Sequence, residues 1–184
     1  MNTSDVLKYG HLTIMEAIKE LPEADWYTPG VCGYWSVKDI MAHLISFEHM
    51  LIDVLNSLQG EEYTPTLDAF VRDAEQFNQD EVAKRCDHSV AYILAQYETA
   101  YAKASVLLSQ IPVEGRRVNG ALEWYGAEYD LEDFITYAFY GHKREHAAQI
   151  NVFRDMLAQT PVVDNQVVIS SEGFAQPVEW QVTR

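Results

Sequence analysis

Apolar residues recur every three or four positions in four long stretches of the chain, which is the pattern of amphipathic helices. In the second stretch the residues Ile40, Leu44 and Phe47 lie on one such face. The sequence predicts long helices over residues 4–20, 37–59, 89–110 and 130–159. No repeat of 20–50 residues and no low-complexity tract accompanies them, so we expect an all-α fold with four helices around one core.

Capping residues mark where these helices begin and end. Ser4 can cap the first helix, and Ser36, followed three residues later by Asp39, can cap the second. Gly60 ends the second helix, and Asp130 can begin the last one. These signals place short connections around the predicted helices.

The connections and the tail differ from the helices in pattern. Residues 60–87 read as a long connection with a short helical piece over about 67–77. Beyond Pro161 the chain has short β-prone runs between turn residues, which predicts an irregular or β-hairpin tail. We therefore expect a helical bundle over 1–160 and a C-terminal extension over 161–184 that is not a separate domain.

Composition narrows the functional classes. The chain has 184 residues, 48% of them hydrophobic and 22% charged, as in a globular protein. It carries 28 acidic and 13 basic residues, for a net charge of −15, which argues against binding to nucleic acid or to an anionic membrane. No apolar stretch approaches the length of a membrane span. Cys32 and Cys86 show no metal or disulfide spacing, so we expect reduced thiols and a cytoplasmic location.

Three of the six histidines form a candidate metal site. His142 and His146 lie four residues apart, so their imidazoles share one face of the last helix. His43 lies on the apolar, inward face of the second helix. Three imidazoles would leave at least one coordination position open for water or substrate. The other three histidines, His11, His49 and His88, are predicted to be solvated.

Two motifs that contain these histidines resemble a known family. They are Trp35-Ser-Val-Lys-Asp-Ile-Met-Ala-His43-Leu and Tyr140-Gly-His142-Lys-Arg-Glu-His146-Ala-Ala-Gln-Ile150. Over about residues 4–159 the chain resembles the DinB/YfiT-like superfamily of four-helix metal-binding proteins. The resemblance implies that His43, His142 and His146 bind nickel, zinc or a similar divalent ion.

The same resemblance implies a chemistry. Characterised relatives include thiol S-transferases and an isomerase that use bacillithiol, mycothiol or glutathione, with the metal lowering the pKa of the thiol. A coordinated thiol or water would be a nucleophile at neutral pH. The expected function is transfer of a low-molecular-weight thiol to an electrophile in stress or detoxification. Zinc and nickel are the first candidates, and iron, manganese and copper stay open. Glu48, Glu145, Asp39 and inward tyrosines are candidate orienters of the imidazoles.

Two other functions stay open. His142-Lys-Arg-Glu145-His146 also fits the inverted zincin string, in which the glutamate is the general base of a hydrolase. A non-catalytic bundle is the other alternative, with Tyr34, Trp35, Trp124 and Tyr125 lining a cavity for a small ligand. In each case the expected partner is a small molecule, and apolar helix faces also suggest a homodimer.

Overall fold

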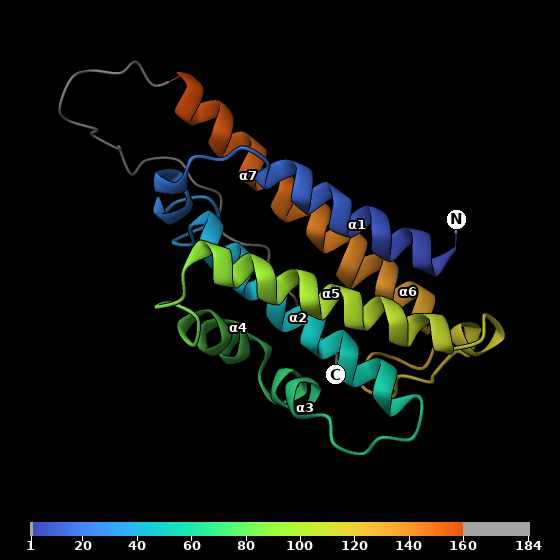
Figure 1. Cartoon of the computed structure of the whole chain (residues 1–184). Coiled ribbons are helices and arrows are strands. Elements are labelled where there is room, and N and C mark those ends of the chain that lie inside the picture. The colour runs from blue at the N-terminus through green and yellow to red at the C-terminus, as the bar shows by residue number, and fades with distance from the viewer. Residues whose placement is uncertain (1, 160–184) are drawn as a thin grey trace.

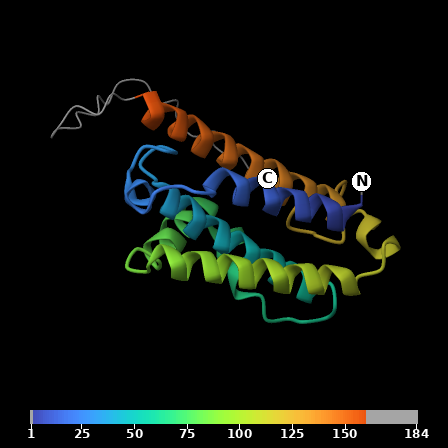
Figure 2. The same cartoon turned by 45° about the horizontal axis from the view of Figure 1, so that its top comes forward.

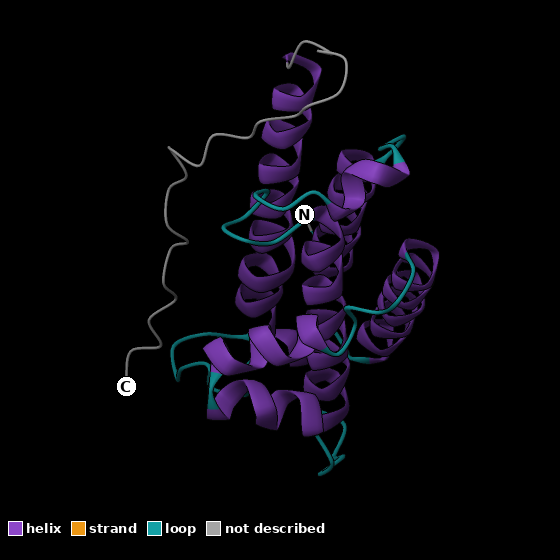
Figure 3. Cartoon of the chain, turned by 90° about the vertical axis from the view of Figure 1, so that its left-hand side faces the viewer, coloured by secondary structure: helices purple, strands orange, loops and turns teal. Residues whose placement is uncertain are grey.

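The computed structural model describes residues 2–159, which form helices, loops and turns without a β-strand (Figures 1 and 3). The predicted all-α bundle is confirmed. The long helices within the described residues are α1 (Thr3–Ile18), α2 (Val37–Ser57), α5 (Val90–Gln110) and α7 (His142–Gln159). The connections contain the shorter helices α3 (Pro65–Arg72), α4 (Ala74–Ala83) and α6 (Leu131–Ile135) and the turns η1 (Glu23–Tyr27), η2 (Glu114–Arg117) and η3 (Thr136–Gly141).

The long helices associate mainly as two pairs, α1 with α7 and α2 with α5 (Figures 1 and 2). The short helices α3 and α4 pack on another side of α2. Because α2 has neighbours on several sides, most of its length is buried, including Ile45, Met50 and Leu55. α2 is thus the central element of the fold, and it carries His43.

Side-chain caps fix the predicted helix starts. The Ser36 hydroxyl accepts the Asp39 amide while the Asp39 carboxylate accepts the Ser36 amide, a complete capping box at the start of α2. Asp130 and Asp133 form a second capping box at the start of α6. Gly60 follows α2 with φ +94°, which is strained for any residue with a Cβ. These three predictions are confirmed.

Other predicted boundaries were wrong. Asn2 caps α1 by accepting the Asp5 amide, so the predicted cap Ser4 lies inside the helix. The connection after α2 holds two helices and not one, because Asp73 ends α3 and its side chain caps α4 by accepting the Gln76 amide. Nothing in the local sequence pattern marked a break between two helices at this aspartate.

The predicted C-terminal hairpin lies outside the described residues. Among the residues that are described, no helix is both long enough and apolar enough to cross a membrane.

A π-helical turn connects α6 to α7. In η3 the amide of His142 donates to the carbonyl of Tyr137, five residues earlier, so one extra residue is inserted into the helical repeat. Helix α1 packs closely against this turn at Gly10. A Cβ at Gly10 would lie 2.3 Å from the carbonyl oxygen of Phe139. Only glycine therefore allows this approach, and the turn that precedes His142 is held by it.

We expect Gly10→Ala to lower the free energy of unfolding by about 1–3 kcal/mol, because backbone atoms must move to accept the methyl group. Urea unfolding followed by circular dichroism measures this. Gly115→Ala is the matched control, because its Cβ would meet only Ile111 Cγ2 at 3.6 Å, an ordinary contact. Equal stabilities for the two variants would contradict the close packing of α1 on the π turn.

Candidate metal centre

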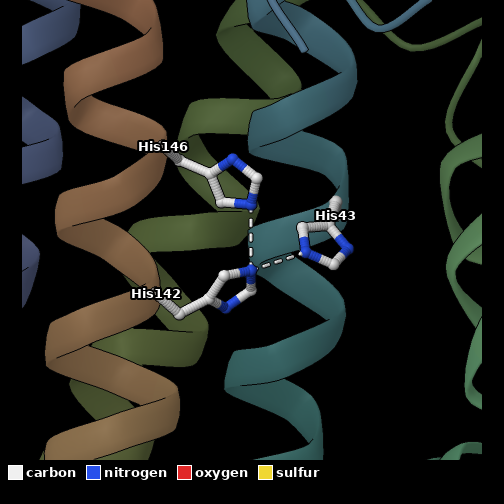
Figure 4. A group of neighbouring side chains, drawn as sticks. All are labelled: His43, His142 and His146. Carbon is white, nitrogen blue, oxygen red and sulfur yellow. Dashed lines mark hydrogen bonds between the residues drawn. The ribbon is translucent and has the colours of Figure 1, made fainter. Parts of the chain in front are cut away.

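The imidazoles of His43, His142 and His146 meet in the space between α2 and α7 (Figure 4). His142 Nε2 lies 3.1 Å from His43 Nε2 and 2.9 Å from His146 Nε2. The three donor atoms all lie within 4.8 Å of one another, and all three residues are buried. The fold thus brings together residues that are 99 positions apart in the chain.

This geometry suits a metal ion. Two imidazole nitrogens on one tetrahedral zinc ion lie about 3.3 Å apart, because each Zn–N bond is about 2.0–2.1 Å long. The observed separations of 2.9 and 3.1 Å are within a few tenths of an ångström of that value. The triad can therefore hold a metal ion, and three donors would leave at least one coordination position open.

His142 and His146 each have a further hydrogen-bond partner besides the triad. Nδ1 of His146 lies 2.8 Å from Oε1 of Gln149, one turn further along α7. His142 makes a hydrogen bond to the backbone of Ala138, in the π turn. Nδ1–H donation from His146 to Gln149 would leave Nε2 of His146 unprotonated, as a metal ligand requires. The interaction with Ala138 helps to hold the His142 ring in position.

The third ring has a partner from a different helix. Asn78, on α4, interacts with the His43 side chain through hydrogen bonding that raises the His43 pKa. Nδ1 of His43 and Oδ1 of Asn78 are both buried without a close partner in the described structure. A small rotation of the amide would complete an Nδ1–H···Oδ1 bond. His43 would then present Nε2 to the same point as the other two imidazoles.

All three histidines are electrically neutral at physiological pH. Burial lowers the pKa of His43 and of His142 well below the usual value, and the charges of neighbouring histidines lower it further. Burial lowers the pKa of His146 to about 4. With Nδ1 protonated, the Nε2 lone pairs face each other at about 3 Å, a repulsive arrangement that a shared cation would relieve.

A ring of half-buried side chains surrounds the triad. The rings of Trp35 and Phe47 contact His43 with centroid separations of 4.9 and 4.7 Å, and Phe47 also contacts His142 at 4.5 Å. These aromatic side chains, like those of Asn78 and Gln149, are only partly exposed. The triad is thus bordered by two aromatic rings and two amide side chains, all partly shielded from water.

Cys32 lies at the edge of the site. Its thiol interacts with the Gln149 side chain, which also bonds His146. Burial and the charge of Glu145 raise the pKa of Cys32, so its thiol stays protonated at neutral pH. A protonated thiol is a poor nucleophile, so Cys32 is unsuited to nucleophilic attack at neutral pH.

The prediction that His11 is solvated was wrong. Its ring is buried, and it stacks on Tyr101 at a centroid separation of 3.8 Å and near Tyr97. Its spacing of four residues from Leu7 and three from Ile14 places it on the buried face of α1, a signal present in the sequence. His49 is exposed, as predicted, and His88 is half buried.

The candidate orienters have other partners. Asp39 belongs to the capping box of α2, and Glu48 pairs with Lys143. Glu145 is exposed, and its charge acts on Cys32. The partners of the imidazoles are instead Gln149, Asn78 and a backbone carbonyl. Gln149 could have been predicted as a partner, because it belongs to the Gln-Ile end of the second motif. Asn78 could not, because it lies in the connection after α2, where no motif indicates how the chain packs.

Of the aromatic residues proposed to line a cavity, only Trp35 contacts the triad in the described structure. Tyr34 is 96% exposed, so it lines no cavity. Trp124 and Tyr125 pack on Phe134 in the core.

Comparison with known proteins identifies the family. Residues 10–128, more than half of the chain, match the model of the mycothiol maleylpyruvate isomerase N-terminal domain family. The chain belongs to this family. The family falls within the DinB/YfiT-like superfamily, as the two motifs predicted. The match includes His43 and ends before α7, so the mycothiol maleylpyruvate isomerase N-terminal domain model alone does not cover His142 and His146. Searches of curated proteins and of solved structures found no match.

We expect the His146 ring of metal-free protein to titrate with a midpoint near pH 4, measured by NMR and assigned from the resonance lost in His146→Gln. Because the folded-state pKa is depressed from 6.5, the unfolded chain binds the proton first as the pH falls. The free energy of unfolding should therefore decrease between about pH 6.5 and pH 4, by up to about 3 kcal/mol from this residue. A midpoint near 6.5 would contradict the buried, neutral imidazole.

Proposed function

We propose that His43, His142 and His146 bind one divalent metal ion, and that the site transfers a low-molecular-weight thiol to a small electrophile. The observation that carries the proposal is the convergence of three buried, neutral imidazoles whose Nε2 or Nδ1 donor atoms lie within 4.8 Å of one another. Nickel and zinc are the first candidates and iron, manganese and copper the others, because imidazole donors by themselves suit zinc, nickel, copper and iron.

Support for a thiol comes from the family and from the open coordination position. The family is named for an isomerase that uses mycothiol, so mycothiol is the first candidate, with bacillithiol and glutathione as others of the same class. A bound divalent ion would act as a Lewis acid that lowers the pKa of a coordinated thiol or water. Since the Cys32 thiol stays protonated, the reacting sulfur would come from the cosubstrate.

The residues around the triad contribute binding and orientation. The three imidazoles would hold the ion through Nε2, and Gln149 would keep Nδ1 of His146 protonated. Trp35 and Phe47 form apolar walls beside the triad. Such walls favour a small, partly apolar electrophile and protect the thiolate from water.

Metal-dependent hydrolysis of a small substrate is the second candidate. Glu145 lies three residues after His142 on α7, about one turn further on, and its charge acts at the edge of the site, on Cys32. In a hydrolase this carboxylate would be the general base for a coordinated water. Because Glu145 is exposed, the hydrolase is the weaker candidate. The thiol transferase is also supported by the family to which the chain belongs.

The test is a reaction screen with protein reconstituted with zinc or nickel. Mycothiol, bacillithiol and glutathione are each combined with maleylpyruvate, followed by absorbance, and with chlorodinitrobenzene, followed by thioether formation and chloride release. We expect one thiol to be used at least 100-fold faster with the loaded protein than with His142→Ala. His49→Ala, which changes an exposed histidine of α2, should react like the unmodified protein.

The outcomes separate the candidates. Equal rates for the unmodified protein and His142→Ala would overturn the proposed transferase. Release of nitrophenolate from nitrophenyl acetate without a thiol, lost in His142→Ala and in Glu145→Gln, would favour the hydrolase. Binding of aromatic compounds without turnover would favour the non-catalytic bundle.

A further inference from the structure

The two helices that carry the three histidines do not pack mainly against each other. α2 packs chiefly on α5, and α7 packs chiefly on α1 (Figures 1 and 2). Yet a metal ion requires that the nitrogens of His43 on α2 and of the two histidines on α7 all lie within a few tenths of an ångström of the ideal metal–ligand distance. Another contact is therefore needed to fix the axial position of α7 relative to α2.

A buried ion pair joins these two helices beside the site. Nζ of Lys143, the residue after His142 on α7, bonds Oε1 of Glu48 on α2. The side chains are 1% and 0% exposed. Glu48 is five residues after His43, about 140° away around the helix, so its side chain points away from the triad. The pair does not contact the metal-facing nitrogens, although the charge of Lys143 also lowers the pKa of His142.

Aromatic rings fix the lysine on its other sides. Nζ of Lys143 lies 5.5 Å from the centroid of the Tyr97 ring, 5.6 Å from that of Tyr101 and 5.7 Å from that of Phe139. Two of these rings belong to α5 and one to the π turn. The ammonium group thus has one position, set by α2, α5 and the turn that leads into α7.

Stability alone does not explain why two charges are buried here. Removing a carboxylate and an ammonium from water costs several kcal/mol each, and replacing such a pair by apolar residues is often neutral or stabilising. Buried pairs of this kind are best known for fixing the register of helices. Lys143 directly follows the predicted ligand His142, which suggests that the pair fixes the register of α7 for the benefit of the metal site.

We propose that the Glu48–Lys143 pair sets the register of α7 against α2, and thereby holds His142 and His146 at the distances from His43 that one ion requires. Glu48 and Lys143 are positioning residues in this proposal, which rests on the metal centre proposed above. Metal affinity should then depend on the pair more strongly than the stability of the fold does.

The experiment compares the full chain with the double variants Glu48→Leu/Lys143→Met and Glu48→Gln/Lys143→Met. Zinc affinity is measured by competition with a chromophoric chelator, and stability by urea unfolding of the metal-free proteins. The matched control is Glu132→Gln/Arg117→Met, which removes an ion pair between η2 and α6 that is more exposed. We expect the two double variants that change Lys143 to bind zinc about 10–100-fold more weakly. Mutation of residues that orient metal ligands typically lowers metal affinity by this factor.

The urea midpoint of at least one variant should be unchanged or higher, and the control should bind zinc like the unmodified protein. Zinc affinity within twofold of the unmodified protein in a folded variant would overturn the proposal. If neither variant folds, the pair is required for the fold itself, and a role limited to register is overturned. Absence of stoichiometric zinc binding in the unmodified protein would instead overturn the metal centre.

Discussion

The contact of three neutral imidazoles across α2 and α7 is the constraint around which the structure is organised. In the tautomer that carries the proton on Nδ1, the Nε2 lone pairs would face each other at 2.9 and 3.1 Å and repel, because the buried site has little water to separate them. A cation at their common point would turn this repulsion into attraction. The surrounding features serve the same geometry: Gln149 and Ala138 orient the rings of α7, and the π turn positions the start of that helix.

The arrangement also explains the unusual density of polar groups in the core. His43, Glu48, His142, Lys143 and His146 are all buried on two helices. Such groups weaken a bundle unless each has a partner, and here each has one that lies on another element or one turn away. Polar side chains thus occupy positions in the core that apolar residues would otherwise fill, as expected where a fold carries a functional site.

Much of the fold could be predicted from the sequence because its signals are local. Helical periodicity predicted the long helices, and Ser36 and Asp39 marked the start of α2. Asp130 marked the start of α6, but the predicted helix over 130–159 is divided by the π turn, and α7 begins at His142. Features set by tertiary contacts could not be predicted. The π turn depends on the approach of α1 at Gly10, and the role of Asn78 depends on how α4 packs on α2. The predicted ligands were brought together, whereas the acidic candidate orienters proved to bind elsewhere.

The central claim is that the three histidines hold one ion, and the metal content of protein purified without an affinity tag tests it most directly. Elemental mass spectrometry should find about one nickel or zinc ion per chain. His43→Ala, His142→Ala and His146→Ala should each lose that ion, while His49→Ala, the exposed histidine of α2, should keep it. Absence of bound metal after loading, or metal retained in all three triad variants, would contradict the account.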